Sequence, residues 1–401
     1  MTERTNRSSG DDVHAALDVD IGTQRRDRVV AALSDPLTGH DAAAFVHVGT
    51  DCDPGIRYAS QISQQGLTAI AYDSIEREWL IRSTADEPGT HPAERVASVL
   101  ADRGREGTIV TPAGVPHDAA LHLENAGFEL VSTDALERAR AVKTAGECER
   151  ITATQRAASA GIRRAASILA DAVVVDGRLA VGDTVGDGSE TAPDTDADLD
   201  TDPEFLTPAR VRIAIDEAIV RAGALPAGNT AVNPASDTGT IDTALRPGDP
   251  IVLETAPRGP AGYYGGLVRT FVVDSDGGRE RRVHVAVTQS FRSARSMLTA
   301  GPESVTAVEA DLEAEVRSFG IGDSDAIETQ VSGVGLEPRE RPVDGGDTLD
   351  LGTVVRLDVA ARVDRNDWLR IADLLECTDD GERPTWLVAP SQSLDPSAIL
   401  E

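Results

Sequence analysis

Several residue types are scarce in this chain of 401 residues. Its three cysteines lie far apart and form no CxxC pair, which argues against a disulfide framework and a zinc–thiolate site. Aromatic residues make up only 3%, so Ala, Val, Leu and Ile must build most of the core. No basic patch stands out to neutralise phosphates, which argues against nucleic-acid binding. No apolar run is long enough to span a bilayer, so we expect no membrane insertion.

Positive charge is also scarce. The chain has 68 Asp and Glu residues against 38 Lys and Arg residues, a net charge of -30, and its one lysine is Lys143. An acidic, lysine-poor surface keeps a protein soluble where salt screens charge, so we interpret the composition as an adaptation to a halophilic cytoplasm. The polar N-terminus has no apolar segment of the kind found in signal peptides, and we therefore expect a cytoplasmic location.

The pattern along the chain predicts two domains. Residues 1–20 are expected to be a flexible tail. Short apolar runs alternate with amphipathic stretches over 21–137, which predicts an α/β domain. Residues 138–401 form the second domain, and its insertion at 183–204 carries nine acids and no base. Such a segment buries too little apolar surface to fold, so we expect it to be disordered.

The second domain reads as α+β. Apolar residues recur at helical spacing from about 144 to 172, and further helices are expected near 280–299 and 302–318. Strand patterns at 250–257 and 267–274 predict one antiparallel pair, and those at 354–363 and 368–378 predict a hairpin. Paired helices packed on an antiparallel sheet follow from this order.

Four ordered segments resemble the creatinase and Xaa-Pro aminopeptidase family, larger relatives of methionine aminopeptidase with a pita-bread fold. KTAGECERI (143–151) resembles the family's linker into its first long helix, and YYGGLVRTF (263–271) is similar to G-Y-x-x-D-x-x-R-T-F. VSGVGLEPRERP (331–342) is similar to G-H-G-I-G-L-E-x-H-E-x-P, and LRIADLL (369–375) to V-R-I-E-D. DPGIRYAS (53–60) resembles a segment of the family's N-terminal creatinase-like α/β domain.

The resemblance implies hydrolysis by two divalent metal ions that share a water molecule and are held by two Asp, one His and two Glu. Manganese, cobalt or zinc would suit such ligands. In this sequence the five ligand positions are, in order, Glu254, Gly266, Ser332, Asp358 and Ala372. Three of these side chains cannot replace the ligand, and the other two differ in length from it. We therefore expect no metal cofactor and predict that the dinuclear site is lost.

Glu254 and Asp358 are weak candidates for a single cation site. The simpler interpretation is that each is partly buried and paired with an arginine, because an unpaired buried carboxylate is costly. Arg269, Arg356 and Arg370 are the candidate partners. The resemblance also suggests which residues line the inherited cleft: Tyr264, Arg269, Arg339, Glu340 and Arg370. We predict no catalytic residue. The family has two further histidines near its substrate, and this sequence has Arg339 at one of these positions and Ser236 or Asp237 at the other.

Three functions stay open at this stage. The first is a non-catalytic relative that binds a peptide or a small ligand, or that associates with an active paralogue. The second is a hydrolase that cleaves X-Pro peptides through a non-standard site. The third is a metal-independent enzyme, as in creatinase-like members of the fold, although the histidines that creatinase uses are missing here as well. The resemblance implies a homodimer.

Overall fold

The computed structural model describes residues 9–60, 66–182, 203–234, 243–321, 325–364, 367–378 and 382–400. The chain divides into two compact units, residues 1–148 with 335–341, and residues 149–334 with 342–401. The boundary therefore lies inside the first turn of a long helix, about ten residues beyond the predicted boundary, and a short segment near residue 340 belongs to the first unit. The acidic insertion lies almost wholly outside the described residues.

The first unit is a five-stranded sheet in the order β3-β2-β1-β4-β5, with β1, β4 and β5 parallel. Its elements are α1 Ser9–Gly39, β1 Ala44–Gly49, α2 Pro54–Ser60, β2 Thr68–Asp73, β3 Glu78–Ser83, α3 Pro92–Asp102, β4 Thr108–Pro112, α4 His117–Asn125, β5 Glu129–Thr133 and α5 Ala135–Ala141. The predicted α/β class is confirmed. The predicted tail over 1–20 is wrong from Ser9 onward, where α1 begins; residues 1–8 lie outside the described part.

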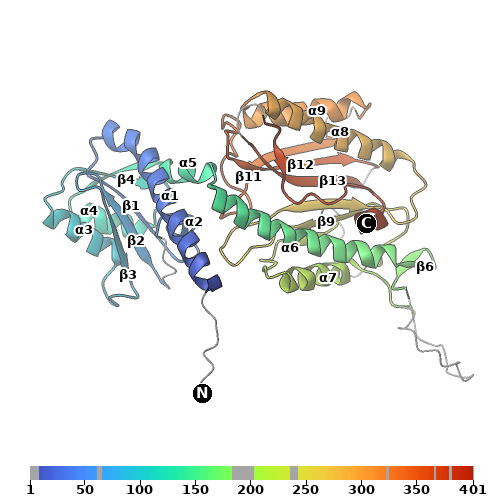
Figure 1. Ribbon diagram of the computed structural model, residues 1–401, viewed down its shortest axis with the longest axis horizontal. Helices are drawn as coiled ribbons and strands as arrows, with labels where there is room; N and C mark the ends of the chain where they lie inside the picture. Colours follow the sequence, from blue (N-terminus) through green and yellow to red (C-terminus); the bar gives the residue numbers. More distant parts are fainter. Residues whose placement is uncertain are drawn as a thin grey trace, which may run out of the picture. The chain divides into compact units, whose positions relative to one another are not determined.

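The second unit is built on a seven-stranded, mainly antiparallel sheet in the order β11-β12-β13-β10-β9-β8, with β14 beside β13 (Figure 1). Its elements are α6 Ala145–Ala170, β6 Val173–Val175, β7 Arg178–Ala180, α7 Pro208–Arg221, β8 Thr230–Val232, β9 Ile251–Thr255, β10 Leu267–Phe271, α8 Arg279–Ala300, α9 Val305–Ser318, β11 Ile327–Gly333, β12 Val354–Arg362, β13 Trp368–Glu376, β14 Thr385–Trp386 and a 3-10 helix Pro396–Ile399. Both predicted strand pairs are confirmed.

Strand periodicity separates the two faces of this sheet. In β12, Val355, Leu357 and Val359 belong to a core shared with α8 and α9. Leu253 of β9 and Leu267 of β10 belong to the core shared with α6 and α7. Successive side chains on a strand point to opposite faces, so the residues between these apolar ones lie on the face that these four helices leave uncovered. We call it the concave face.

Burial of the apolar side chains drives this arrangement. Fully burying a Val, Leu or Ile side chain contributes about 1.5–3 kcal/mol before the cost of ordering the chain. Helix α7 begins at Pro208, because Thr207 accepts a hydrogen bond from the backbone N–H of Arg210 and Pro208 occupies the first turn. Among the described residues, no helix is both long and apolar enough to cross a bilayer.

Candidate functional site: an arginine–carboxylate tetrad

The strand register brings distant segments to one line on the concave face. Glu254 of β9 lies opposite Val268 of β10, and Val268 lies opposite Ala372 of β13. Ala372 in turn lies opposite Asp358 of β12. Because directly opposed residues point to the same face, the side chains of Glu254, Ala372 and Asp358 all lie on the concave face.

The other two positions that the resemblance assigns to metal ligands belong to the same region. Ser332 of β11 lies opposite Arg356, which precedes Asp358 by two residues and therefore shares its face. A Cβ atom added to Gly266 would lie 3.5 Å from Nη1 of Arg356 and 3.7 Å from Leu374. The side chain that Gly266 lacks would thus point toward the Arg356 guanidinium.

Two arginines bind the two carboxylates at this place. Nη2 of Arg356 donates to Oε1 of Glu254 at 2.8 Å and to Oδ2 of Asp358 at 2.7 Å. Nη1 of Arg370 donates to Oε2 of Glu254 at 2.8 Å. Nε and Nη2 of Arg370 also donate to Oδ1 and Oδ2 of Asp358, at 2.7 and 2.6 Å. We call Glu254, Arg356, Asp358 and Arg370 the tetrad.

The tetrad is electrically balanced and largely removed from water. The side chain of Asp358 is 4% exposed and that of Arg356 is 10% exposed, whereas those of Glu254 and Arg370 are about one quarter exposed. Burial acts to raise the pKa of Asp358, but the charges and hydrogen bonds of Arg356 and Arg370 outweigh it and hold this pKa below its ordinary value. The bonded carboxylates likewise raise the pKa of Arg370 against the effect of burial. Asp358 and Arg370 are therefore charged near neutral pH.

This donor set does not fit a pair of divalent metal ions. Both available carboxylates have their oxygens engaged by guanidinium groups, and the remaining positions offer a glycine, a serine hydroxyl and a methyl group. Within the described residues, no group of three or more His, Cys, Asp or Glu is arranged to hold a metal. A metal ion here would have to displace two hydrogen-bonded arginines without gaining new ligands.

Arg269 does not belong to this face, contrary to its prediction as a cleft residue and as a partner of the two acids. It lies between Val268 and Thr270 on β10, so strand periodicity turns its side chain to the opposite face. There it is fully buried and donates from Nη2 to Oδ1 of Asp373 at 2.6 Å and to the carbonyl oxygen of Pro390 at 2.8 Å. Its charge serves the packing of the C-terminal segment.

The other predicted cleft residues have separate surroundings. Glu340 belongs to the first unit, where its carboxylate accepts from Nζ of Lys143 at 2.8 Å and is also bound by Arg140. The single lysine of the chain is therefore a buried structural cation. Arg339 is exposed in the same segment, and Tyr264 is half-buried in the β9–β10 connection. Of the five predicted cleft residues, the tetrad contains only Arg370.

A cavity of about 450 Å³ opens on the concave face beside the tetrad. Asp358 and Arg370 form part of its wall, and the rest comes from the following residues: Asn233, Pro234, Pro250, Val252, Glu328, Thr329, Gln330, Ala360, Asp367 and Trp368. None of these ten residues was predicted from the sequence as a site residue. Spacing along β13 carried a usable signal, because Trp368 precedes Arg370 by two residues and must share its face.

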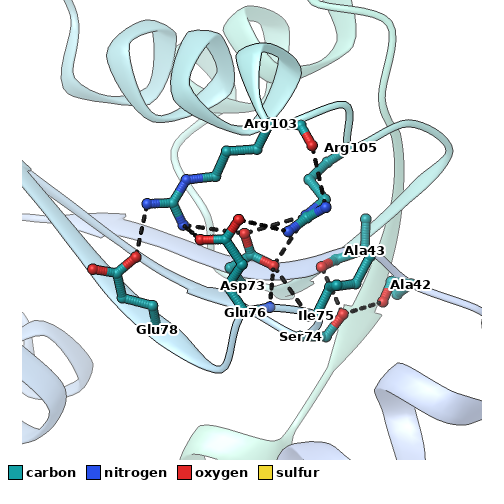
Figure 2. Close-up of polar contacts among 9 residues, drawn as sticks. All are labelled: Ala42, Ala43, Asp73, Ser74, Ile75, Glu76, Glu78, Arg103 and Arg105. Carbon is teal, nitrogen blue, oxygen red and sulfur yellow. Dashed lines mark hydrogen bonds and ion pairs between the residues drawn. The ribbon is translucent and has the colours of Figure 1, made fainter.

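A second charged cluster, in the first unit, has a structural role (Figure 2). Asp73 at the end of β2 is fully buried; Oδ1 accepts from Nε of Arg105 at 3.1 Å, and Oδ2 accepts from Nη1 of Arg103 at 3.2 Å. The same carboxylate accepts from the backbone N–H groups of Ile75 and Glu76, which closes the turn between β2 and β3. Burial favours a higher pKa for Asp73, yet these bonds keep the pKa below its ordinary value.

Comparison with known proteins agrees with this architecture. Residues 217–379, which include the whole tetrad, match the model of metallopeptidase family M24. The structure is similar to the prolidase from Pyrococcus furiosus (TM-score 0.66, 17% identity), covering 89% of this chain and 99% of the prolidase. It is also similar to the Xaa-Pro dipeptidase from Bacillus anthracis (TM-score 0.71, 13% identity, coverage 92% and 99%).

The same fold occurs in a protein whose name is not that of a peptidase. The N-terminal domain of FACT complex subunit SPT16 from Cicer arietinum matches with a TM-score of 0.66 and 11% identity, covering 94% of this chain and 98% of that domain. No curated protein sequence matches the chain. The solved structures therefore show the fold, which is the pita-bread fold of the prolidases. The similarity to the M24 metallopeptidase family model extends over residues 217–379.

Proposed function

We propose that this chain is a non-catalytic M24 homologue in which the tetrad replaces the dinuclear metal centre, and that its concave face binds a small ligand. The observation that carries the proposal is the position of the Arg356 guanidinium, whose Nη2 bridges Glu254 and Asp358 at 2.8 and 2.7 Å. These are the two acids at positions to which the resemblance assigns metal ligands.

The charge of the site supports this proposal. Two guanidinium groups neutralise two carboxylates, so the tetrad satisfies its own charges. Separating such buried pairs costs several kcal/mol per ion unless new partners replace the old ones. Gly266, Ser332 and Ala372 supply no such partners, and a metal ion would therefore meet a large cost on entry.

The groups next to Ser332 in the strand register also offer no general base among the described residues. Asp358 is held in its ionised form by two arginines, so it is a poor acceptor for a proton near neutral pH. His284, the last histidine of the chain, lies on α8, and its Nε2 is 2.5 Å from the carbonyl oxygen of Gln392. Ser332 consequently has no neighbouring base to activate it among the described residues of this face.

The test combines metal content with turnover. Purified protein is dialysed against manganese, cobalt or zinc in potassium chloride, and bound metal is counted by mass spectrometry. Cleavage of X-Pro dipeptides is then followed in the same samples. The proposal expects far less than one metal per chain and no turnover. One or two metals per chain together with X-Pro cleavage would reject it in favour of a metallopeptidase.

A further inference from the structure

Three residues that lie opposite one another on neighbouring strands form the floor of the cavity beside the tetrad. Glu328 of β11 lies opposite Ala360 of β12, and Ala360 lies opposite Arg370 of β13. All three line the cavity. The small side chain of Ala360 leaves room above the strands between a carboxylate on one side and the tetrad on the other. A volume of about 450 Å³ lies within the range of small-molecule sites.

The charge of this cavity is not balanced. Asp358 and Arg370 form ion pairs within the tetrad, which has no net charge as a whole. The side chains of Glu328 and Asp367 form no hydrogen bond or ion pair with any residue that the structure describes. The walls therefore carry two uncompensated negative charges next to a neutral cluster.

A neighbouring group responds to this excess of negative charge. Asp249 directly precedes Pro250, which lines the cavity. Its pKa is raised, first by burial and second by the charge of Asp367, while the charge of Arg246 acts to lower it. The charge of Asp367 thus outweighs that of Arg246 at Asp249, which agrees with an excess of negative charge at this end of the cavity.

The rest of the lining suits an organic cation better than a bare metal ion. Trp368, Val252 and Pro250 contribute apolar wall to the cavity. The Trp368 ring already accepts one cation, since the guanidinium carbon of Arg362 lies 5.0 Å from its centroid. A ligand with a positive head and a short apolar body would pair its charge with Glu328 and Asp367 and pack its body on these walls.

We propose that this cavity binds a small organic cation, an alkylammonium or guanidinium compound of a few carbon atoms. The inference rests on the proposed non-catalytic function, because it requires Arg370 and Asp358 to stay paired and leave Glu328 and Asp367 as the only free charges among the described residues that line the cavity. The positive group is held by these two carboxylates, and the carbon chain lies along Trp368.

The experiment uses n-butylammonium and agmatine as probes, with butyrate, 1-butanol and potassium ions as matched controls at constant ionic strength. Binding to the full-length protein is followed by saturation-transfer NMR and tryptophan fluorescence. We expect both cations to bind and butyrate and butanol not to bind. Glu328→Gln and Asp367→Asn should each weaken binding by about tenfold or more. Asp276→Asn, an exposed acid of the same unit outside the cavity, should leave binding unchanged.

Several results would overturn the inference. These are no binding of either amine, equal binding of butyrate, displacement of the amines by an equal concentration of potassium, or full affinity in both cavity variants. Circular dichroism of each variant shows whether it is folded. The proposed non-catalytic function is tested separately, by measuring metal content and X-Pro cleavage in the absence of any amine.

Discussion

Removal of Arg356 tests the tetrad most sharply as a structural element. In Arg356→Met the aliphatic stem is retained while the guanidinium that bridges Glu254 and Asp358 is lost. Two unit charges about 4 Å apart attract by about 4 kcal/mol at an effective dielectric constant near 20, and breaking a buried pair costs about 3–5 kcal/mol. Arg370 still binds Asp358 through two hydrogen bonds. We therefore expect a loss of about 3 kcal/mol in the free energy of unfolding.

The assay is urea unfolding followed by circular dichroism at low and at high potassium chloride. Because Arg356 is 10% exposed, salt should screen little of the effect, and the loss should persist at high salt. The matched control is Arg317→Met, which removes an exposed pair with Glu313 on α9 and should cost less than about 1 kcal/mol. If Arg356→Met costs no more than this control, the reasoning about the tetrad is wrong.

Three other predictions follow from the site and the first unit. Gly266→Asp, Ser332→His and Ala372→Glu together should fail to bind manganese by calorimetry, and adding Arg356→Ser with Arg370→Ser should allow binding, because the two guanidinium groups occupy the ligand carboxylates; binding by the triple variant would contradict this. Asp73→Asn should lower the free energy of unfolding by about 2 kcal/mol in urea, because the neutral amide loses the charge-assisted hydrogen bonds to Arg103 and Arg105, which keep only the exposed carboxylates of Glu76 and Glu78; a cost below about 1 kcal/mol would refute that role. The stability that ionised Asp358 contributes should be present above about pH 4 and be lost as pH falls through its lower folded pKa. In an acid titration, the free energy of unfolding of Arg356→Met should therefore fall less than that of wild type. An equal fall in both proteins would argue against the pairing.

A pH effect near neutrality is expected from the first unit. Nδ1 of His91 accepts a hydrogen bond from the backbone N–H of Ala93 and so caps α3. Burial and the nearby His122 lower the pKa of His91, so the folded state prefers the neutral ring. This stability is present above about pH 6.5 and is lost as pH falls through the lower folded pKa. His91→Ser keeps a cap without a titrating group, so its urea midpoint should fall less between about pH 7 and pH 5 than that of wild type. An equal fall would contradict the assignment.

Much of the fold could be predicted because apolar periodicity is strong where helices cover a sheet. The alternation in β12 and β13 and the stripe on α8 come from contact with one core, so they are visible in the sequence. Strand β11 was missed because Glu328, Gln330 and Ser332 face the open concave side and leave few apolar positions in IETQVSG. The start of α1 was missed because an acidic, weakly apolar segment carries little helical signal.

The site could be predicted only in part. Resemblance to known motifs indicated which positions lack metal ligands, but pairing between strands about 100 residues apart decides which arginines meet Glu254. Strand periodicity would have excluded Arg269 from the face, since it is one residue removed from Val268. The cavity could not be predicted, because Val252, Glu328 and Trp368 come from three different strands that only the folded sheet brings together.

The central claim is that arginine side chains stand where relatives with the full ligand set would hold metal. A crystal structure of the protein grown with excess manganese, with anomalous diffraction recorded, tests it most directly. The account predicts Nη2 of Arg356 within hydrogen-bonding distance of both Glu254 and Asp358, and no anomalous peak within about 3 Å of either carboxylate. An anomalous peak bound to these carboxylates, with Arg356 and Arg370 turned away, would contradict it.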